Sequence, residues 1–272
     1  MKRQRPSPKL IFICHNVLPH ESKRWDEWAL RLALSSGDGF IAHSYANAEE
    51  LAQYFPAAGI QVAPHPSYGA LSTIEPAVVD FDLPDDRPLL LFIGFVRPYK
   101  GLDILLDAMP RILRSRSLHL LVAGEFWQGD QPYVNQIHRL GIGQAVTMEN
   151  RYLPNEELSA VLARADVVVL PYRTATQSGI VQLAFGSQKP VITTDVGGLA
   201  EAVQDGQMGL VVPPEDPEAL AAAVIRFFDE DLGPVFQEHI RRDSQRFSWQ
   251  QMVRAITDLA EPGLDNEVSE PI

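Results

Sequence analysis

Two stretches of the sequence combine residue types that bind anions. Residues 97–101 (RPYKG) place Arg97 and Lys100 together in a turn. The second stretch, residues 176–179, follows an apolar segment and precedes a short apolar helix. The first turn of a helix has free backbone N–H groups and a partial positive charge, and Gly179 allows a ligand to approach the backbone closely. Side chains that form hydrogen bonds are supplied by Thr176, Gln177 and Ser178. Together these stretches predict a site for a phosphorylated ligand.

Each stretch also has an ordinary structural explanation when it is taken alone. Residues 174–179 are equally typical of an N-capped helix, and two cations in a turn are more often solvated than bound to a ligand. Three turns that are expected to converge favour a ligand-binding site over these structural explanations. The turns at 97–101, 124–127 and 174–179 each follow an apolar run typical of a buried strand. Because parallel strands end at one edge of a sheet, these turns are expected to line one crevice, where cations and helix amides oppose the charge of a diphosphate.

Other polar residues give weaker signals. His15 and Asn16 follow the apolar segment 10–14, and His20 lies close behind. A histidine at a strand end can orient a sugar or an acceptor hydroxyl, but a loop histidine with an ordinary hydrogen bond is the commoner case. No pair of carboxylates has a spacing that identifies a general base; they are scattered at Glu125, Glu149 and Glu201.

The motif content argues against several cofactor classes. Residues 94–101 lack both the glycines of a dinucleotide-binding fingerprint and the GxxxxGK[ST] pattern of a P-loop. There is no cysteine cluster and no HExxH motif, so we expect neither a metal nor another cofactor. The single cysteine, Cys14, cannot form an internal disulfide and has apolar neighbours. It is expected to be a buried strand thiol in a cytoplasmic protein.

Charge and hydropathy narrow the possible partners. The 272 residues carry a formal net charge of -12, which argues against a nucleic-acid partner because nucleic acids require a basic surface. No apolar run approaches the roughly 20 residues that span a bilayer. The apolar run at 10–14 is also too short for an export signal. A basic head could contact an acidic membrane surface, although a solvated terminus is commoner; it comprises Lys2, Arg3, Arg5 and Lys9.

The first part of the chain predicts three short strands and two helices. Strands are expected at residues 10–14, 40–42 and 60–63. The segment 25–34 predicts an amphipathic helix with Trp28 and Leu32 on its apolar face. Ser44 is expected to cap a helix over residues 46–54. Prolines then recur at positions 64, 66, 76, 84 and 88, which indicates a domain boundary.

After Pro88, strands and helices alternate regularly, which predicts an α/β domain with a doubly wound parallel sheet. The expected strands cover residues 89–96, 118–123, 145–148, 166–170, 190–194 and 209–212. The expected helices cover residues 102–113, 132–140, 156–163 and 217–228, with a short one starting at 179 and one or two more over 235–260. The predicted divisions are a partial first domain at 1–75, a linker at 76–87, a second domain at 88–230, helices at 231–261 and a polar tail at 262–272.

Four segments of this second domain carry a family resemblance. They are LLLFIGFVRPYKGLDILLDAM (89–109), LLVAGE (120–125), RYLPNEELSAVLARADVVVLPYR (151–173) and KPVITTDVGGLAEAV (189–203). In this order they resemble the nucleotide-sugar half of family 4 glycosyltransferases. The resemblance implies a GT-B architecture, in which two Rossmann-like domains face each other and the final helix crosses back to the first domain. It also implies glycosyl transfer from a nucleoside-diphosphate sugar, usually with retention and without a metal.

The resemblance also implies roles for individual residues. Arg97 and Lys100 match the turn that holds the donor diphosphate, and Gly94 matches a tight glycine beside the donor. The segments containing Glu125 and Arg151 would flank the nucleotide. The loop from Thr176 to Gly179 matches the one that contacts phosphate and sugar, and residues 13–21 (ICHNVLPHE) resemble a first-domain loop in which His15 would touch the transferred sugar.

Two departures from the family pattern stand out. The family usually carries two glutamates eight positions apart around the donor loop, whereas Ala175 and Leu183 occupy those places here. A branch with ATQSG in this place is closer, and Gln182 could replace the ribose contact, although one helical step turns it about 100° away. The region before the linker is also short for a complete Rossmann-like domain. It predicts a truncated or reduced first domain, or one completed by a partner chain.

These observations favour a transferase that moves a sugar from a nucleoside-diphosphate sugar to a carbohydrate or lipid-linked hydroxyl acceptor, as in polysaccharide assembly. Arg97, Lys100 and the amides at Ser178 and Gly179 would stabilise the departing diphosphate. The main alternative is a catalytically silent subunit that binds the nucleotide sugar and completes another chain. A sugar-nucleotide epimerase would share the donor site but should need acidic catalysts, which the sequence does not identify.

Overall fold

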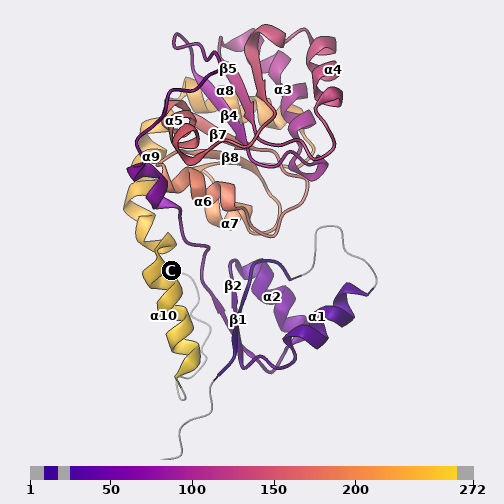
Figure 1. Cartoon of the computed structure of the whole chain (residues 1–272), viewed down its shortest axis with the longest axis vertical. Helices are drawn as coiled ribbons and strands as arrows, with labels where there is room; N and C mark the ends of the chain where they lie inside the picture. Colours follow the sequence, from indigo (N-terminus) through magenta and orange to yellow (C-terminus); the bar gives the residue numbers. More distant parts are fainter. Residues whose placement is uncertain (1–8, 18–24, 262–272) are drawn as a thin grey trace, which may run out of the picture.

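The computed structural model describes residues 9–17 and 25–261, and their strands form two parallel sheets (Figure 1). The first sheet has the order β1-β2-β3, and its register pairs Phe12 with Phe40 and Phe40 with Ile60. Helices α1 (Asp26–Leu34) and α2 (Tyr45–Tyr54) lie between these strands in the chain, as parallel pairing requires. The strands are β1 (Ile11–Cys14), β2 (Gly39–Ala42) and β3 (Gly59–Val62).

The second sheet has six parallel strands in the order β6-β5-β4-β7-β8-β9. The chain runs outward from β4 on one side and from β7 on the other, which is the doubly wound arrangement. The crevice at the point where the direction reverses is the usual ligand position in such sheets. The strands are β4 (Leu89–Ile93), β5 (His119–Ala123), β6 (Val146–Glu149), β7 (Val167–Leu170), β8 (Val191–Thr194) and β9 (Gly209–Val212).

Helices cover both faces of this sheet, which explains why its central strands are apolar throughout. One face packs against α3 (Leu102–Ser115), α4 (Gln131–Leu140) and α8 (Pro217–Asp229). The other packs against α5 (Asn155–Arg164), α6 (Gly179–Gly186) and α7 (Leu199–Val203). Short 3-10 helices lie at η2 (Pro98–Lys100) and η3 (Gly143–Ala145).

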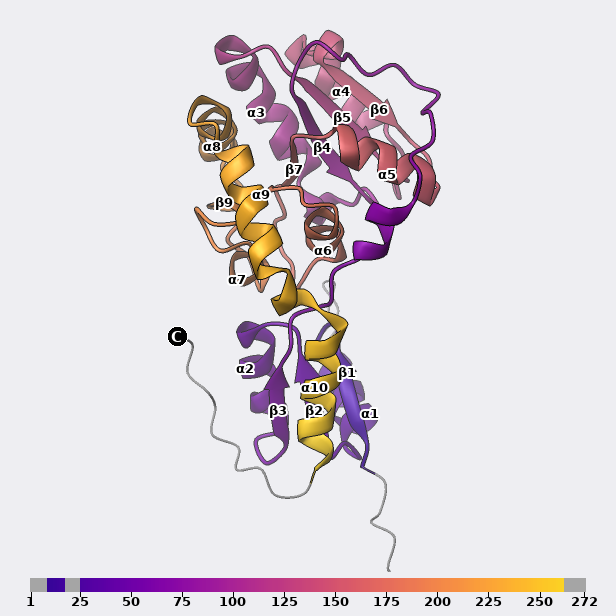
Figure 2. The ribbon, with the colours of Figure 1, turned by 90° about the vertical axis from the view of Figure 1, so that its left-hand side faces the viewer.

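The end of the chain returns from the second sheet to the first (Figure 2). Helix α9 (Leu232–Arg242) packs on the second half, and η4 (Asp243–Phe247) leads into α10 (Trp249–Ala260). Met252 and Ala255 of α10 bury themselves against Ile41 of β2. Because side chains alternate along a strand, the neighbouring Phe40 faces the opposite side and packs in the cluster that α1 and α2 complete.

The two halves also meet through Glu201 of α7. Its Oε2 accepts a hydrogen bond from the amide of Tyr45 at 2.7 Å, and its Oε1 accepts one from Ala46 at 3.0 Å. These donors belong to the first turn of α2, where a carboxylate is favourable. Ser44 caps the same helix through the amide of Asn47, as the sequence predicted.

Two sequence expectations about the elements are wrong, and one helix was not predicted. Trp28 and Leu32 of α1 are 67% and 61% exposed, because α1 turns Leu30 and Leu34 toward the core instead. The strand expected over residues 89–96 ends at Ile93, because the next residue adopts a left-handed backbone. Helix α7 was not expected, since its five residues are too few to show a helical period.

Several expectations lie outside the described residues: those for His20, for the basic residues Lys2, Arg3 and Arg5, and for the tail 262–272. Within the part of the chain that the structure describes, no helix has the length and apolar character needed to cross a membrane. Cys14 is buried as predicted, and burial raises the pKa of its thiol to about 11.

Candidate functional site

The site begins where strands β4 and β5 end in glycines. Gly94 follows β4 with φ of 105°, and Gly124 follows β5 with φ of 141°. A Cβ added to Gly124 would lie 2.2 Å from the carbonyl oxygen of Gly94, so a larger residue cannot fit. The backbone of the two strand ends is therefore packed tightly and leaves space on its open side for a ligand.

Lys100 lies against this glycine pair. Its side chain is buried, and a Cβ added to Gly94 would lie 3.1 Å from both the Lys100 Nζ and the Cδ1 of Ile180, in the first turn of α6. The ammonium is 5.4 Å from the centre of the Tyr172 ring. Burial lowers the pKa of Lys100, and the nearby Arg97 lowers it further. Among the described residues no carboxylate forms an ion pair with this lysine, so its charge is available to an anion.

Arg97 and Glu125 flank the same strand ends. The Arg97 guanidinium stacks on the Trp127 ring at 4.4 Å from its centre. The carbonyl of Glu125 accepts a hydrogen bond from the amide of Val96 at 2.9 Å, which joins the loops after β4 and β5. The exposed Glu125 side chain lies at the margin of the site.

The loop from Thr176 to Gly179 lies at the end of β7, the strand next to β4. Ser178 caps α6, because its Oγ accepts from the amide of Ile180 at 3.2 Å, and it lies 3.4 Å from the Tyr172 hydroxyl. The Thr176 hydroxyl contacts the side-chain oxygen of Asn16, which belongs to the first half of the chain. The loop thus connects the two halves and presents the first turn of α6 beside Lys100.

A pocket of about 240 Å³ occupies this edge of the second sheet, and we call it the strand-end pocket. Lys100 and Glu125 are the charged residues in its described lining, and Tyr152 adds an exposed aromatic ring. Its remaining walls are apolar or glycine: Ile93, Gly94, Phe95, Ala123, Gly124, Leu153, Leu158, Ile180 and Leu183. An apolar slot with one buried cation suits a flat base attached to an anionic group.

Three histidines gather opposite the loop, at the ends of the first sheet's strands. The His15 ring lies 4.8 Å from that of His43 and 5.5 Å from that of His65. The Nδ1 of His43 lies 2.9 Å from the carbonyl oxygen of Ala63, and its Nε2 lies 3.2 Å from the Nδ1 of His15. Burial lowers the pKa of His43 to about 4.

These contacts fix the protons of neutral His43 and His15. A carbonyl oxygen only accepts, so the His43 Nδ1 carries the proton and donates it to Ala63. The His43 Nε2 is then an acceptor and receives a hydrogen bond from the Nδ1–H of His15. The Nε2 of His15 is left with a lone pair, which can accept a hydrogen bond from a ligand hydroxyl.

Of the predicted site residues, Gly94, Lys100 and Glu125 line the strand-end pocket, whereas Gln177, Ser178 and Gln182 line a separate cavity and Arg151 lies elsewhere. Arg151 forms ion pairs with Asp80 at 2.7 Å and Glu157 at 2.6 Å and does not line the strand-end pocket. Gln182 is also turned away: Leu183 lines the pocket, whereas Gln182 faces a separate cavity. One step along a helix rotates a side chain by about 100°, which accounts for this difference. The expectation that Gln182 takes the place of a ribose-binding carboxylate is therefore not supported by its orientation.

His43 and His65 were not predicted from the sequence. Each follows a strand of the first sheet, β2 or β3, just as His15 follows β1. Because parallel strands end at one edge of a sheet, these positions could have grouped all three histidines. Among the described residues, no group of histidine, cysteine or carboxylate side chains is arranged to hold a metal ion.

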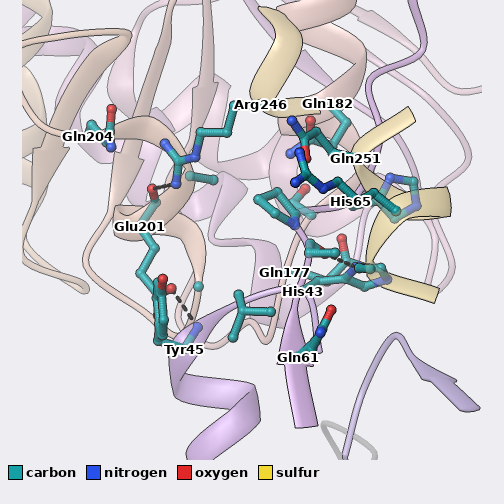
Figure 3. A pocket seen from close by; sticks show the side chains of 18 of the residues that line it. His43, Tyr45, Gln61, His65, Gln177, Gln182, Glu201, Gln204, Arg246 and Gln251 are labelled. Atoms are coloured by element: carbon teal, nitrogen blue, oxygen red, sulfur yellow. Dashed lines mark hydrogen bonds between the residues drawn. The ribbon is translucent and has the colours of Figure 1, made fainter. Parts of the chain in front are cut away.

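A second, larger cavity of about 790 Å³ lies between the two halves (Figure 3). The part of the molecule around the first sheet contributes residues of β3, the following segment and α10 to its wall. The part around the second sheet contributes residues of the loop before α6, of α6 and α7, and of η4. The residues that line it include His43, Gln61, Gln177, Gln182, Glu201, Arg246 and Arg254.

Comparison with solved protein structures supports the fold described above. Over 92% of its length the chain is similar to sucrose-phosphate synthase from Thermosynechococcus elongatus, with a TM-score of 0.75, 23% identity and 66% of that chain covered. HepE from Anabaena in complex with UDP is similar over the same share, with a TM-score of 0.74, 21% identity and 72% coverage. The α/β fold with two parallel sheets thus matches the GT-B structures.

Sequence relatives point in the same direction. The D-inositol 3-phosphate glycosyltransferase of Saccharomonospora viridis is 31% identical over 186 residues, which are 65% of this chain and 43% of that protein. The chain spans less than half the length of the first curated relatives it matches. The family model described as "Glycosyl transferases group 1" matches residues 87–230, more than half of the chain. The chain therefore belongs to the group 1 glycosyltransferase family.

Proposed function

We propose that this chain binds a nucleoside-diphosphate sugar in the strand-end pocket and transfers the sugar to a hydroxyl of a carbohydrate or lipid-linked acceptor. The observation that carries the proposal is the position of Lys100. A buried ammonium with no ion-pair partner among the described residues lies beside Gly94 and the first turn of α6. A diphosphate would supply the missing negative charge, and the helix amides would bind its oxygens.

The proposed donor lies along the edge of the second sheet. Its base and ribose occupy the apolar strand-end pocket near Tyr152 and Leu183, and its diphosphate lies between Lys100 and Gly179. Structural neighbours support this donor class, since HepE from Anabaena was solved with UDP and with UDP-glucose. The sugar then extends toward Thr176 and the histidines of the first sheet.

Charge stabilisation is the main chemical contribution of the site. In the transfer, the bond between the anomeric carbon and the diphosphate oxygen breaks, a bond to the acceptor oxygen forms, and the proton of the acceptor hydroxyl passes to the departing diphosphate. Lys100, Arg97 and the α6 amides stabilise the negative charge on the leaving diphosphate. These fixed cations support a metal-independent reaction, and the family resemblance supports retention of configuration. The free Nε2 of His15 accepts a hydrogen bond from a hydroxyl of the transferred sugar.

A second candidate function is a catalytically silent nucleotide-sugar-binding subunit. It is favoured by Ala175 and Leu183, which stand where the family usually has two glutamates. Leu183 is 7% exposed and forms part of the pocket wall, so this position offers the ribose no hydrogen bond from its side chain. In this case the donor binds but is not turned over.

Two measurements on the whole chain separate these functions. Isothermal titration with UDP, GDP and ADP should show binding of at least one; a folded chain that binds none of them contradicts both proposals. The corresponding nucleotide sugar is then incubated with the protein, and the release of free sugar is measured. Slow release supports the transferase, whereas tight binding without any release supports the silent subunit.

A further inference from the structure

A tyrosine from the segment between the two sheets lies along one face of helix α6. Figure 2 shows this segment beside the helix, where it leads into η1 (Gly69–Thr73). A Cβ added to Gly186, at the end of α6, would lie 2.7 Å from the carbonyl carbon of Tyr68, so a larger residue cannot fit there. The amide of Tyr68 donates to the carbonyl oxygen of Gln182 at 3.4 Å. These contacts fix the backbone of Tyr68 against the second half of α6.

The side chain of Tyr68 reaches from there to the start of the helix. A Cβ added to Gly179, the first residue of α6, would lie 3.8 Å from the Tyr68 hydroxyl oxygen and 3.9 Å from its Cε2. Gly179, Gln182 and Gly186 share one face of the helix, because they follow one another at steps of three and four positions. The tyrosine follows this face, and its hydroxyl ends beside the first turn of α6, where backbone amides have no partner within the helix.

The adjoining face of α6 borders the strand-end pocket. Ile180 lines that pocket, and its Cδ1 and the Lys100 Nζ each lie 3.1 Å from the position of a Cβ added to Gly94. One step along a helix turns the side chain by about 100°, so Tyr68 and Lys100 approach the first turn from different directions. An anion bound at this turn would have an ammonium group on one side and a phenol hydroxyl on the other.

The Tyr68 hydroxyl is available to such a ligand. It forms no hydrogen bond with another residue that the structure describes, and the side chain is 42% exposed. The Tyr68 ring lies 5.5 Å from that of His65, which lies 5.5 Å from that of His15. A phenol hydroxyl can donate a hydrogen bond to a phosphate oxygen. Tyr68 therefore offers a neutral donor between the first turn of α6 and the histidines toward which the sugar of the proposed donor extends.

We propose that Tyr68 binds the terminal phosphate of the nucleoside diphosphate through its hydroxyl and thereby selects diphosphates over monophosphates. This role rests on the proposed donor site and holds for the transferase and for the silent subunit alike. With the base in the strand-end pocket, the first phosphate is the one nearer to the pocket, and the terminal phosphate is the one nearer to Tyr68 and His15. In the transferase, the same hydrogen bond stabilises the charge on the terminal phosphate as its bond to the sugar breaks.

The substitution Tyr68→Phe tests this role, because it removes the hydroxyl and keeps the ring against Gly179. Isothermal titration compares each nucleoside diphosphate with its monophosphate: UDP with UMP, GDP with GMP and ADP with AMP. For the pair that the wild-type protein binds, the dissociation constant of the diphosphate should rise about 10-fold, as expected for a lost hydrogen bond to a charged group. The dissociation constant of the monophosphate should stay unchanged, and so should the Tm of the ligand-free protein.

Tyr54→Phe is the matched control. Tyr54 ends α2 in the cluster around the first sheet, and its ring centre lies 5.1 Å from the Arg31 guanidinium. The same atom is removed there at a distance from α6, so this variant should bind both nucleotides as the wild type does.

The outcomes separate the role of Tyr68 from the donor site itself. Unchanged diphosphate affinity in Tyr68→Phe would overturn the role of Tyr68 and leave the donor site intact. An equal loss for diphosphate and monophosphate would show that the hydroxyl does not recognise the terminal phosphate and would also overturn it. A folded wild-type chain that binds no nucleotide would contradict the donor site and the role of Tyr68 together.

Discussion

Replacing Lys100 by methionine removes the central cation of the proposed donor site and keeps an unbranched side chain. Lys100 is 8% exposed and is the one lysine or arginine in the described lining of the strand-end pocket. A hydrogen bond to a charged group contributes about 1.5 to 3 kcal/mol, which corresponds to roughly a 10-fold to 150-fold change in affinity. The dissociation constant for the nucleoside diphosphate should rise by this factor.

The same substitution should not destabilise the ligand-free protein. Burial lowers the pKa of Lys100, so between the lowered value and the ordinary lysine value the unfolded state binds more protons than the folded state. The free energy of unfolding of the wild-type protein therefore rises with pH through this window. Lys100→Met lacks this dependence, and its stability relative to the wild type should be greatest below the window and decline as pH rises.

Isothermal titration and urea unfolding at several pH values measure the two effects. Lys189→Met is the matched control: burial also lowers the pKa of Lys189, but its Nζ donates to the carbonyl of Ala163, away from the pocket. The control should bind the nucleotide as the wild type does. Unchanged nucleotide affinity in a folded Lys100→Met protein would refute the role of Lys100, and an equal loss in Lys189→Met would show a general effect of lost charge.

Three further predictions concern other parts of the structure. Burial lowers the pKa of His43 to about 4, so between that value and the ordinary histidine value the unfolded state binds more protons than the folded state. The free energy of unfolding should therefore fall as pH drops through this window. Urea unfolding of His43→Gln should show a shallower fall, and a slope identical to that of the wild type would contradict this role of His43. Glu201→Gln should lower the free energy of unfolding by about 1 kcal/mol, because it removes a carboxylate that accepts hydrogen bonds from two backbone amides of α2. Urea unfolding with no such decrease would contradict this. Cys14, whose pKa is raised to about 11, should react with a thiol reagent only on unfolding, and rapid labelling of the native protein would be inconsistent with its burial.

The sequence predicted the second sheet well, for a physical reason. Its strands are buried on both faces and appear as continuous apolar runs, so segments such as 118–123 and 166–170 differ from the observed strands by only one residue at the start. The first sheet was also identified, from three shorter runs. The prediction of the apolar face of α1 was wrong. Trp28 and Leu32 have the spacing of one helix face, but the core lies on the other side of the helix.

The candidate site was predictable only in part. The shared edge of a parallel sheet brought Gly94, Lys100 and Ile180 in the first turn of α6 together, whereas Gln177 and Ser178 of the preceding loop line the larger cavity. The direction of Gln182 depended on the rotation of α6 about its axis, which no sequence pattern specifies. The larger cavity depends on how α10 returns to the first sheet, and contacts between such distant segments leave no local signal.

The proposed nucleoside-diphosphate site in the strand-end pocket is tested most directly by a crystal structure of this chain with the nucleotide selected by titration. We expect a phosphate oxygen within hydrogen-bond distance of the Lys100 Nζ and the backbone amide of Gly179, with the base beside Tyr152 and Leu153. A nucleotide bound elsewhere, or a phosphate that contacts neither Lys100 nor the first turn of α6, would contradict it.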